Sequence, residues 1–148
     1  MSKYSLPKKT PVVSEENAHA QIMMLVERYG IDVDNMTEDK REAVEQALDH
    51  LSSAITKGHI SVEEIEGEVK VTQFLQHKSA DGNIDELVFR EMRGRDHVKM
   101  SEKNNDNQYK KMQALLAAMC ETPNGHHAIG LLRASDASTA EWLSTLFL

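Results

Sequence analysis

The chain has 148 residues and a formal net charge of −7 at pH 7, which argues against broad attraction to nucleic-acid backbones or anionic membranes. A lone cysteine, Cys120, excludes an intrachain disulfide framework and indicates a reducing compartment. No apolar run approaches the roughly 18 residues of a membrane span, and the N-terminus lacks the apolar region of a signal peptide. We therefore expect a soluble cytoplasmic protein.

The first part of the chain predicts two amphipathic helices after a short arm. Residues 1–13 carry two prolines and no hydrophobic period, which indicates a flexible arm. Ser14 and Thr37 are typical N-cap residues, and Gly30 is a typical helix stop. Apolar side chains then recur every three or four residues, so 14–58 should form a helical hairpin. The two stripes are Ala18, Ile22, Leu25, Val26 and Tyr29, and Val44, Ala47, Leu48, Leu51 and Ile55.

The hydrophobic period changes to two in the middle of the chain. Residues 68–77 and 84–92 are rich in β-branched and apolar side chains that alternate with polar ones. The turn sequence Ser-Ala-Asp-Gly-Asn lies between them. We therefore predict one β-hairpin over 68–92. The acidic run before it, which contains Glu63 and Glu64, is interpreted as a solvated linker.

Residues 94–148 predict further helices. A short charged helix follows Gly94, and the last helix begins at Ser135 or Ser138. The helix between them carries a stripe of Tyr109, Met112, Leu115, Leu116 and Met119. The expected fold class is α+β, mostly helical with one β-hairpin and about five helices, and 14–148 should form a single domain.

The sequence offers no clear catalytic or metal-binding motif. Glycine-rich phosphate loops and zinc-type spacings of cysteine and histidine are absent. Cys120 could act as a nucleophile only with a positioned base such as His126 or His127. A cysteine at the end of an apolar helix face is more often a small buried side chain. We expect no enzymatic activity, no metal and no cofactor.

Five basic side chains fall within ten positions in the segment 90–99. It could contact phosphates, and a small nucleic-acid-binding regulator is therefore the alternative function. Acidic residues in the same segment dilute the positive field. We prefer to interpret it as a structural corner, in which Gly94 frees the backbone and Asp96 favours the start of the next helix. The basic residues are Arg90, Arg93, Arg95, His97 and Lys99.

Several short motifs follow one another over 84–148. They are a strand that leads into Gly94-Arg95-Asp96, the pair Leu115-Leu116, the segment Leu132 to Ser135-Asp136, and the final Phe147-Leu148. In this order they resemble the small tail assembly chaperones of long-tailed bacteriophages. The resemblance implies a non-enzymatic protein of the host cytoplasm that binds the tape measure protein and tail tube subunits. This chain differs from the family in having Arg93 where the family often has a threonine, and in having a longer helical N-terminal part.

The last helix supplies the candidate partner-binding residues. An apolar chain end usually docks on the protein's own core or on a partner, and we favour the core here because apolar stripes are more often core than interface. Eight methionines are many for this length and suit adaptable apolar surfaces, including those of a homo-oligomer. The candidates are Trp142, Leu143, Leu146 and Phe147.

Overall fold

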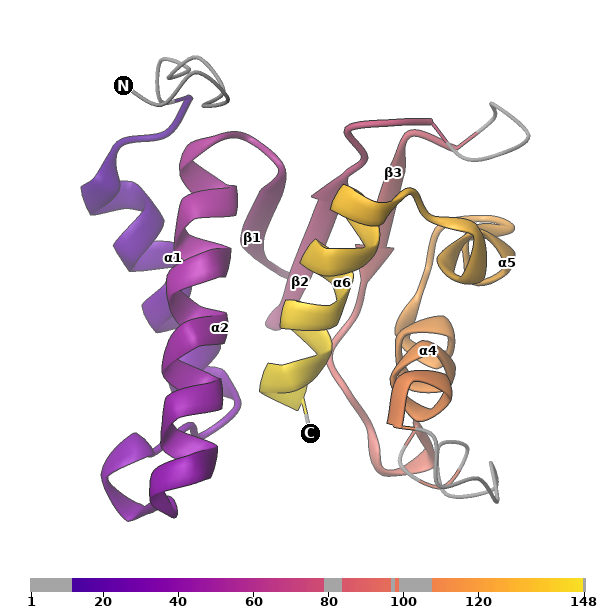
Figure 1. The fold of residues 1–148 in the computed structure, drawn as a ribbon. Helices are drawn as coiled ribbons and strands as arrows, with labels where there is room; N and C mark the ends of the chain where they lie inside the picture. Colours follow the sequence, from indigo (N-terminus) through magenta and orange to yellow (C-terminus); the bar gives the residue numbers. More distant parts are fainter. Residues whose placement is uncertain (1–11, 79–83, 97, 99–107, 148) are drawn as a thin grey trace, which may run out of the picture.

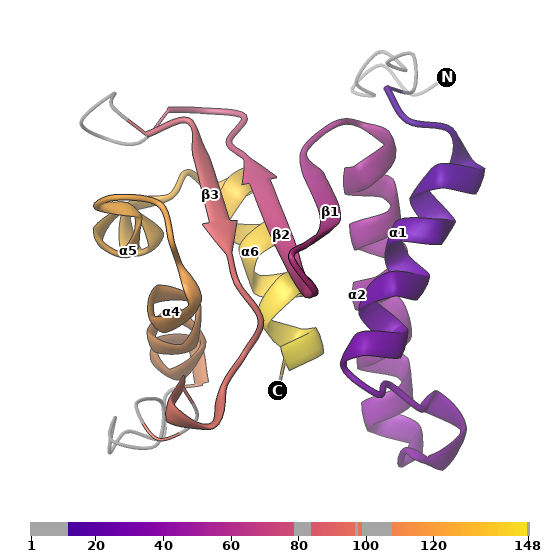
Figure 2. The same cartoon turned by 180° about the vertical axis from the view of Figure 1, so that it is seen from behind.

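The structure, a computed structural model, describes residues 12–78, 84–96, 98 and 108–147. The chain is mostly helical with one antiparallel sheet, which confirms the predicted α+β class (Figure 1). The pair α1 and α2 lies beside the β1 edge of the sheet, α6 crosses one face, and α4 and α5 lie beyond β3. The opposite face, which Figure 2 turns toward the viewer, has no described helix over it.

The two N-terminal helices begin and end where the sequence places their caps. Helix α1 spans Glu15–Arg28 and α2 spans Glu38–Thr56, with the short 3₁₀ helix η1, Val33–Asn35, between them. The Ser14 side chain accepts a hydrogen bond from the Asn17 N–H, and the Thr37 side chain accepts one from the Lys40 N–H. Each bond satisfies a donor that the first helical turn leaves unpaired.

The sheet contains the predicted hairpin and one strand more. Strands β1 (Ile60–Ile65), β2 (Glu68–Phe74) and β3 (Glu86–Phe89) follow one another in the order β1-β2-β3, all antiparallel. The β2–β3 pair, in which Val71 lies opposite Phe89, is the predicted hairpin with shorter strands.

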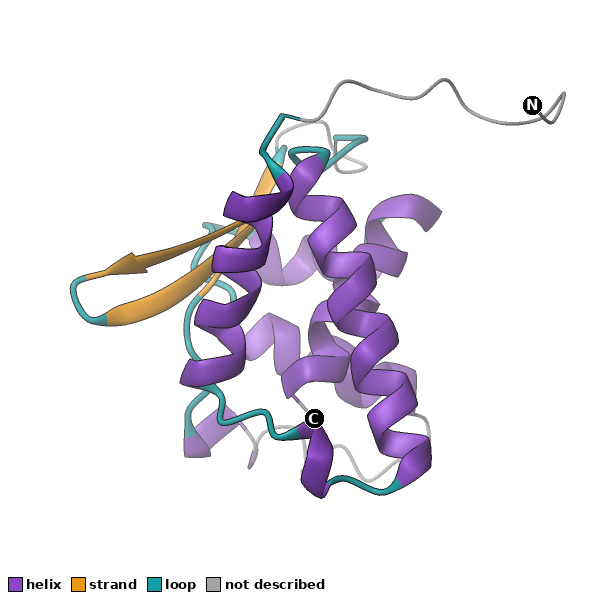
Figure 3. Ribbon diagram, turned by 90° about the vertical axis from the view of Figure 1, so that its left-hand side faces the viewer, coloured by secondary structure: helices purple, strands orange, loops and turns teal. Residues whose placement is uncertain are grey.

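The acidic run is the clearest correction, because it forms strand β1 rather than a solvated linker. Ile60 and Val62 point into the core, whereas the strand is exposed from Glu63 onward. The alternation of buried and exposed side chains is therefore confined to the first half of the strand. A tight turn joins β1 to β2, with positive φ angles of 53° at Glu66 and 79° at Gly67. This combination is typical of a two-residue hairpin turn. Figure 3 shows the resulting β1–β2 hairpin reaching outward past the helices.

The C-terminal part consists of α4 (Gln108–Met119), α5 (Gly125–Ala128), the 3₁₀ helix η2 (Ile129–Leu131) and α6 (Ala134–Phe147). Helix α6 begins one residue before Ser135, so neither serine is at the predicted cap position. Its first turn instead carries Asp136, whose buried carboxylate accepts hydrogen bonds from the backbone N–H groups of Gln76 and His77. This carboxylate fastens the end of β2 to the start of α6.

The buried apolar side chains form one continuous cluster between the sheet and the helices. The inner face of the sheet contributes alternate residues of all three strands, among them Val62, Val71 and Phe89. Helix α6 packs against α2 and lies across one face of the sheet (Figure 1), and Leu143 is completely buried. Because α6 occupies this central position, the C-terminal end of the chain is part of the core rather than an appendage.

The chain after α4 covers the outer edge of β3. The Arg90 N–H donates to the carbonyl of Met119, and the Glu121 N–H donates to the carbonyl of Val88. The Thr122 hydroxyl oxygen accepts a hydrogen bond from the Val88 N–H. At the other edge of the sheet, the Gln21 side chain of α1 accepts from the Val62 N–H in the middle of β1.

Candidate functional site

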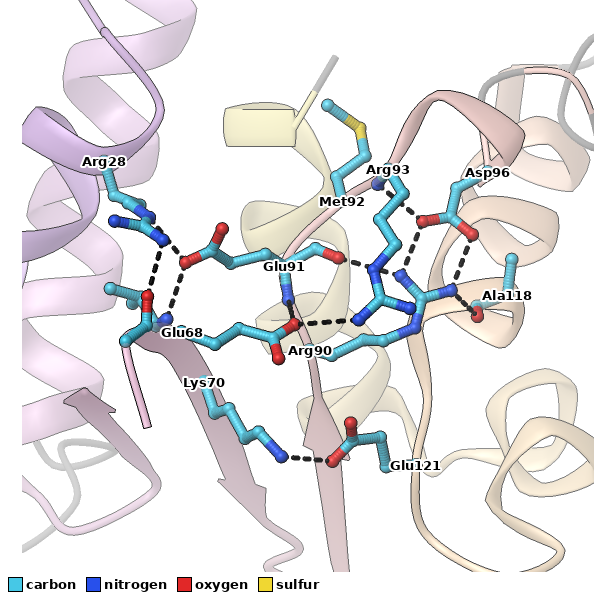
Figure 4. Close-up of polar contacts among 12 residues, drawn as sticks. Arg28, Glu68, Lys70, Arg90, Glu91, Met92, Arg93, Asp96, Ala118 and Glu121 are labelled. Atoms are coloured by element: carbon cyan, nitrogen blue, oxygen red, sulfur yellow. Dashed lines mark hydrogen bonds and ion pairs between the residues drawn. The ribbon is translucent and has the colours of Figure 1, made fainter. Parts of the chain in front are cut away.

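A buried ion pair holds the corner where β3 ends. Arg90 and Asp96 meet through two hydrogen bonds of 2.7 and 2.8 Å, and their side chains are 9% and 1% exposed (Figure 4). The guanidinium also donates to the carbonyl oxygens of Glu91 and Ala118, so it joins β3 to the last turn of α4. The Arg90 guanidinium is therefore buried in contacts within the protein and does not present its charge to a partner.

Asp96 organises the start of the next helical turn. Its carboxylate accepts a hydrogen bond from the Arg93 N–H three residues earlier, which is the contact an acidic side chain makes at the third position of a helix. Hydrogen bonding to Arg90, and then to the Arg93 N–H, holds the pKa of the Asp96 carboxyl below its usual value. The arrangement agrees with a structural corner at Gly94 to Asp96.

Carboxylates pair with three other cations around this corner. Arg28 at the end of α1 pairs with Glu91 at 2.6 Å, and Arg93 lies 3.5 Å from Glu68. Lys70 on the outer face of β2 pairs with Glu121 at 2.8 Å. Within the described part of this corner, the positive charges are therefore largely balanced, and the geometry gives no support to phosphate binding. Arg95 is exposed, whereas residues 97 and 99 lie outside the described residues.

The structure places most of the predicted partner-binding residues in the core. Leu143, Leu146 and Phe147 are buried, and the Phe147 ring lies 5.0 Å from that of Tyr29 on the α1 side. Trp142 is half-buried and stacks on His50 of α2 at 4.3 Å between ring centroids. These contacts attach α6 to the N-terminal helices.

A shallow apolar groove lies on the other side of α6, where it faces α4 and η2. The space in it is small, about 20 Å³, which is room for about one water molecule. Helix α4 contributes Met112, Gln113 and Leu116 to the lining, and η2 and the residue after it contribute Ile129 and Leu132. Helix α6 contributes four residues, mostly small ones, and they are Ala137, Ala140, Glu141 and Ser144. The sequence reasoning missed this groove, although the recurrence of small residues along one face of α6 is a signal for it.

The groove is too small to hold a cofactor. Its volume of about 20 Å³ is far below the roughly 300–1,000 Å³ of small-molecule sites, and it lacks the several convergent polar groups that orient such ligands. Met112 is half-buried, and its unbranched side chain adapts readily to different apolar surfaces.

The described residues show no assembled reactive centre. Burial raises the pKa of the Cys120 thiol, which lowers its nucleophilicity at neutral pH. No group of three or more histidine, cysteine or carboxylate side chains converges for a metal within the part of the chain that is described. In that same part, no helix has both the length and the apolarity to cross a membrane.

Comparison of the chain with protein-family models, with curated proteins and with solved structures gives no match.

Proposed function

We propose that this protein is a tail assembly chaperone of a long-tailed bacteriophage, which binds the tape measure protein and tail tube subunits in the host cytoplasm. The resemblance over 84–148 motivates the proposal. A tape measure protein is a long and largely helical chain, and its apolar stripes are exposed until the tail tube surrounds it. A chaperone for such a chain needs an adaptable apolar surface and no catalytic chemistry.

The groove between α4 and α6 is the observation that carries the proposal. All of its lining residues fall between Met112 and Ser144, within the part of the chain that resembles the chaperones. Met112 and Leu132 at its rim are half-buried, so an amphipathic helix of a partner would contact these apolar side chains rather than enter the groove. The buried positions of Leu143 and Phe147 move the proposed contact from the end of α6 to this groove.

Co-expression provides the test. The chain would be produced with the tape measure protein of the same genome, and the soluble yield of the tape measure protein and its co-purification would be measured. We expect the wild-type chain to keep the tape measure protein soluble, and Met112→Glu to abolish the effect because a charge would enter an apolar contact. Tail tube subunits would be assayed in the same way.

Leu131→Glu is the matched control. Leu131 belongs to η2 and is 62% exposed, but it does not line the groove. The same charge at this site should leave co-purification unchanged. A wild-type chain that neither co-purifies with the tape measure protein or tail tube subunits nor alters their solubility would contradict the proposed function.

A further inference from the structure

We propose that the end of the β1–β2 hairpin, residues 63–69, is attached to the rest of the fold by a charged latch, and that this end opens locally when salt screens the latch. The inference does not depend on the proposed function, because it concerns a movement within the chain and not a partner. The latch consists of four side chains, which are Arg28, Glu68, Glu91 and Arg93 (Figure 4).

The backbone ladder between β2 and β3 ends before β2 does. Its last pair toward the β1–β2 turn is Val71 opposite Phe89, whereas β2 begins at Glu68. Beyond this pair, two carboxylates take the place of backbone partners. The Glu91 carboxylate accepts a hydrogen bond of 2.6 Å from the Val69 N–H, and the Glu68 carboxylate accepts one of 3.2 Å from the Glu91 N–H. On its β3 side, the start of β2 is therefore held by charged side chains.

Arg28 connects this arrangement to α1 and to the turn of the hairpin. Its guanidinium lies 2.6 Å from the Glu91 carboxylate and donates a hydrogen bond of 2.6 Å to the Gly67 carbonyl. The Arg28 side chain is 43% exposed and that of Glu91 is 21% exposed, so dissolved ions can reach the pair. Salt should therefore weaken this contact more than it weakens the buried pair of Arg90 and Asp96.

Apolar burial contributes little to the attachment of the hairpin end. Every residue from 63 to 67 is exposed, and Val69 is the first buried apolar side chain after the turn. Few buried contacts and accessible hydrogen bonds are typical of a segment that opens without global unfolding. Once the latch is screened, residues 63–69 should separate from Glu91 and α1, while the core around Val71 and Phe89 stays intact.

Hydrogen exchange of single amides in the full-length wild-type chain, followed by NMR, tests the latch. The Val69 and Glu91 amides report on the latch, and the Val88 N–H, which donates to Thr122, is the reference. Raising NaCl from about 0.01 to about 1 M shortens the Debye length from about 30 to about 3 Å. Relative to Val88, we expect exchange at Val69 and Glu91 to accelerate about threefold to tenfold.

Arg28→Met removes the charge and keeps most of the apolar part of the side chain. At low salt, the Val69 and Glu91 amides of this variant should already exchange about threefold to tenfold faster than in wild type, and their rates should no longer respond to salt. Arg133→Met is the matched control, because Arg133 is an exposed arginine that precedes α6. It should leave both the exchange rates and their salt response as in wild type.

Two results would overturn the inference. Equal acceleration at Val69, Glu91 and Val88 would show that salt opens the whole domain and not the hairpin end alone. Exchange at Val69 that does not respond to salt, or that is unchanged in Arg28→Met, would show that the latch does not hold the hairpin. Neither result bears on the proposed function, which the co-purification experiment tests separately.

Discussion

Replacing Asp96 by asparagine should cost the protein a large part of its stability. The change keeps the shape of the side chain but leaves the Arg90 guanidinium buried without a counter-charge. Both hydrogen bonds of the pair, at 2.7 and 2.8 Å, lie almost entirely out of solvent. Removing one partner of a buried pair typically costs about 3–5 kcal/mol, against a total of about 5–15 kcal/mol for a domain. We therefore expect Asp96→Asn to lower the free energy of unfolding by about 3 kcal/mol or more.

Urea unfolding provides the assay, because the chain contains a single tryptophan, Trp142, at the α2–α6 contact. Its fluorescence and the far-ultraviolet circular dichroism should report the same transition. Asp49→Asn is the control, because Asp49 is exposed on α2, and it should change the free energy of unfolding by less than about 0.5 kcal/mol. An Asp96→Asn variant that behaves like this control would refute the assignment of Arg90 and Asp96 as the pair that holds the corner.

The pH dependence gives an independent check. The pKa of Asp96 is lower in the folded chain than in the unfolded one, chiefly because of its hydrogen bonds to Arg90. Its contribution is therefore fully present above the unfolded value near pH 4 and is lost as the pH falls through the lower folded value. The difference in stability between wild type and Asp96→Asn should be large at neutral pH and shrink below about pH 4. If the stability difference between wild type and Asp96→Asn instead grew on acidification, the lowered pKa of Asp96 in the folded chain would be contradicted.

Three further changes test the contacts that assemble the fold. Phe147→Ala should lower the free energy of unfolding by about 3–5 kcal/mol, because the ring is 3% exposed. Unchanged thermal melting together with weaker self-association in sedimentation would instead make it a partner contact. Thr37→Ala should cost about 1 kcal/mol in urea titrations through the lost cap of α2, and no loss would argue against that cap. Asp136→Ala should cost about 1–3 kcal/mol, since the N–H groups of Gln76 and His77 lose their acceptor, and hydrogen exchange of both amides should accelerate.

The sequence predicts those parts of the fold that local interactions determine. Ser14 and Thr37 begin their helices because a side-chain oxygen within three residues satisfies a free N–H. The β2–β3 hairpin was predicted because apolar residues alternate on both strands. Strand β1 was not, because only Ile60 and Val62 show the alternation and four glutamates lie close to them. Its formation depends on pairing with β2 and on the turn at Gly67.

The groove and the burial of the C-terminal side chains depend on tertiary contacts that no local pattern encodes. Helix α6 has apolar residues around much of its circumference, so the sequence alone does not say which side meets α2 and which meets α4. The structure assigns Leu143 to the core and Ala140 to the boundary with the groove. Similarly, the six-residue separation of Arg90 and Asp96 does not reveal that both side chains are buried together.

The covered edge of β3 has a consequence for the behaviour of the chain at high concentration. A sheet with open edges can recruit strands from neighbouring molecules and grow into fibres. Here the segment Met119 to Thr122 occupies the hydrogen-bonding groups of β3, and Gln21 blocks the middle of β1. The exposed end of β1 carries Glu63 and Glu64, whose charges repel an identical strand. The β3 edge of the sheet is thus protected against polymerisation by backbone pairing, and the β1 edge is protected by charge.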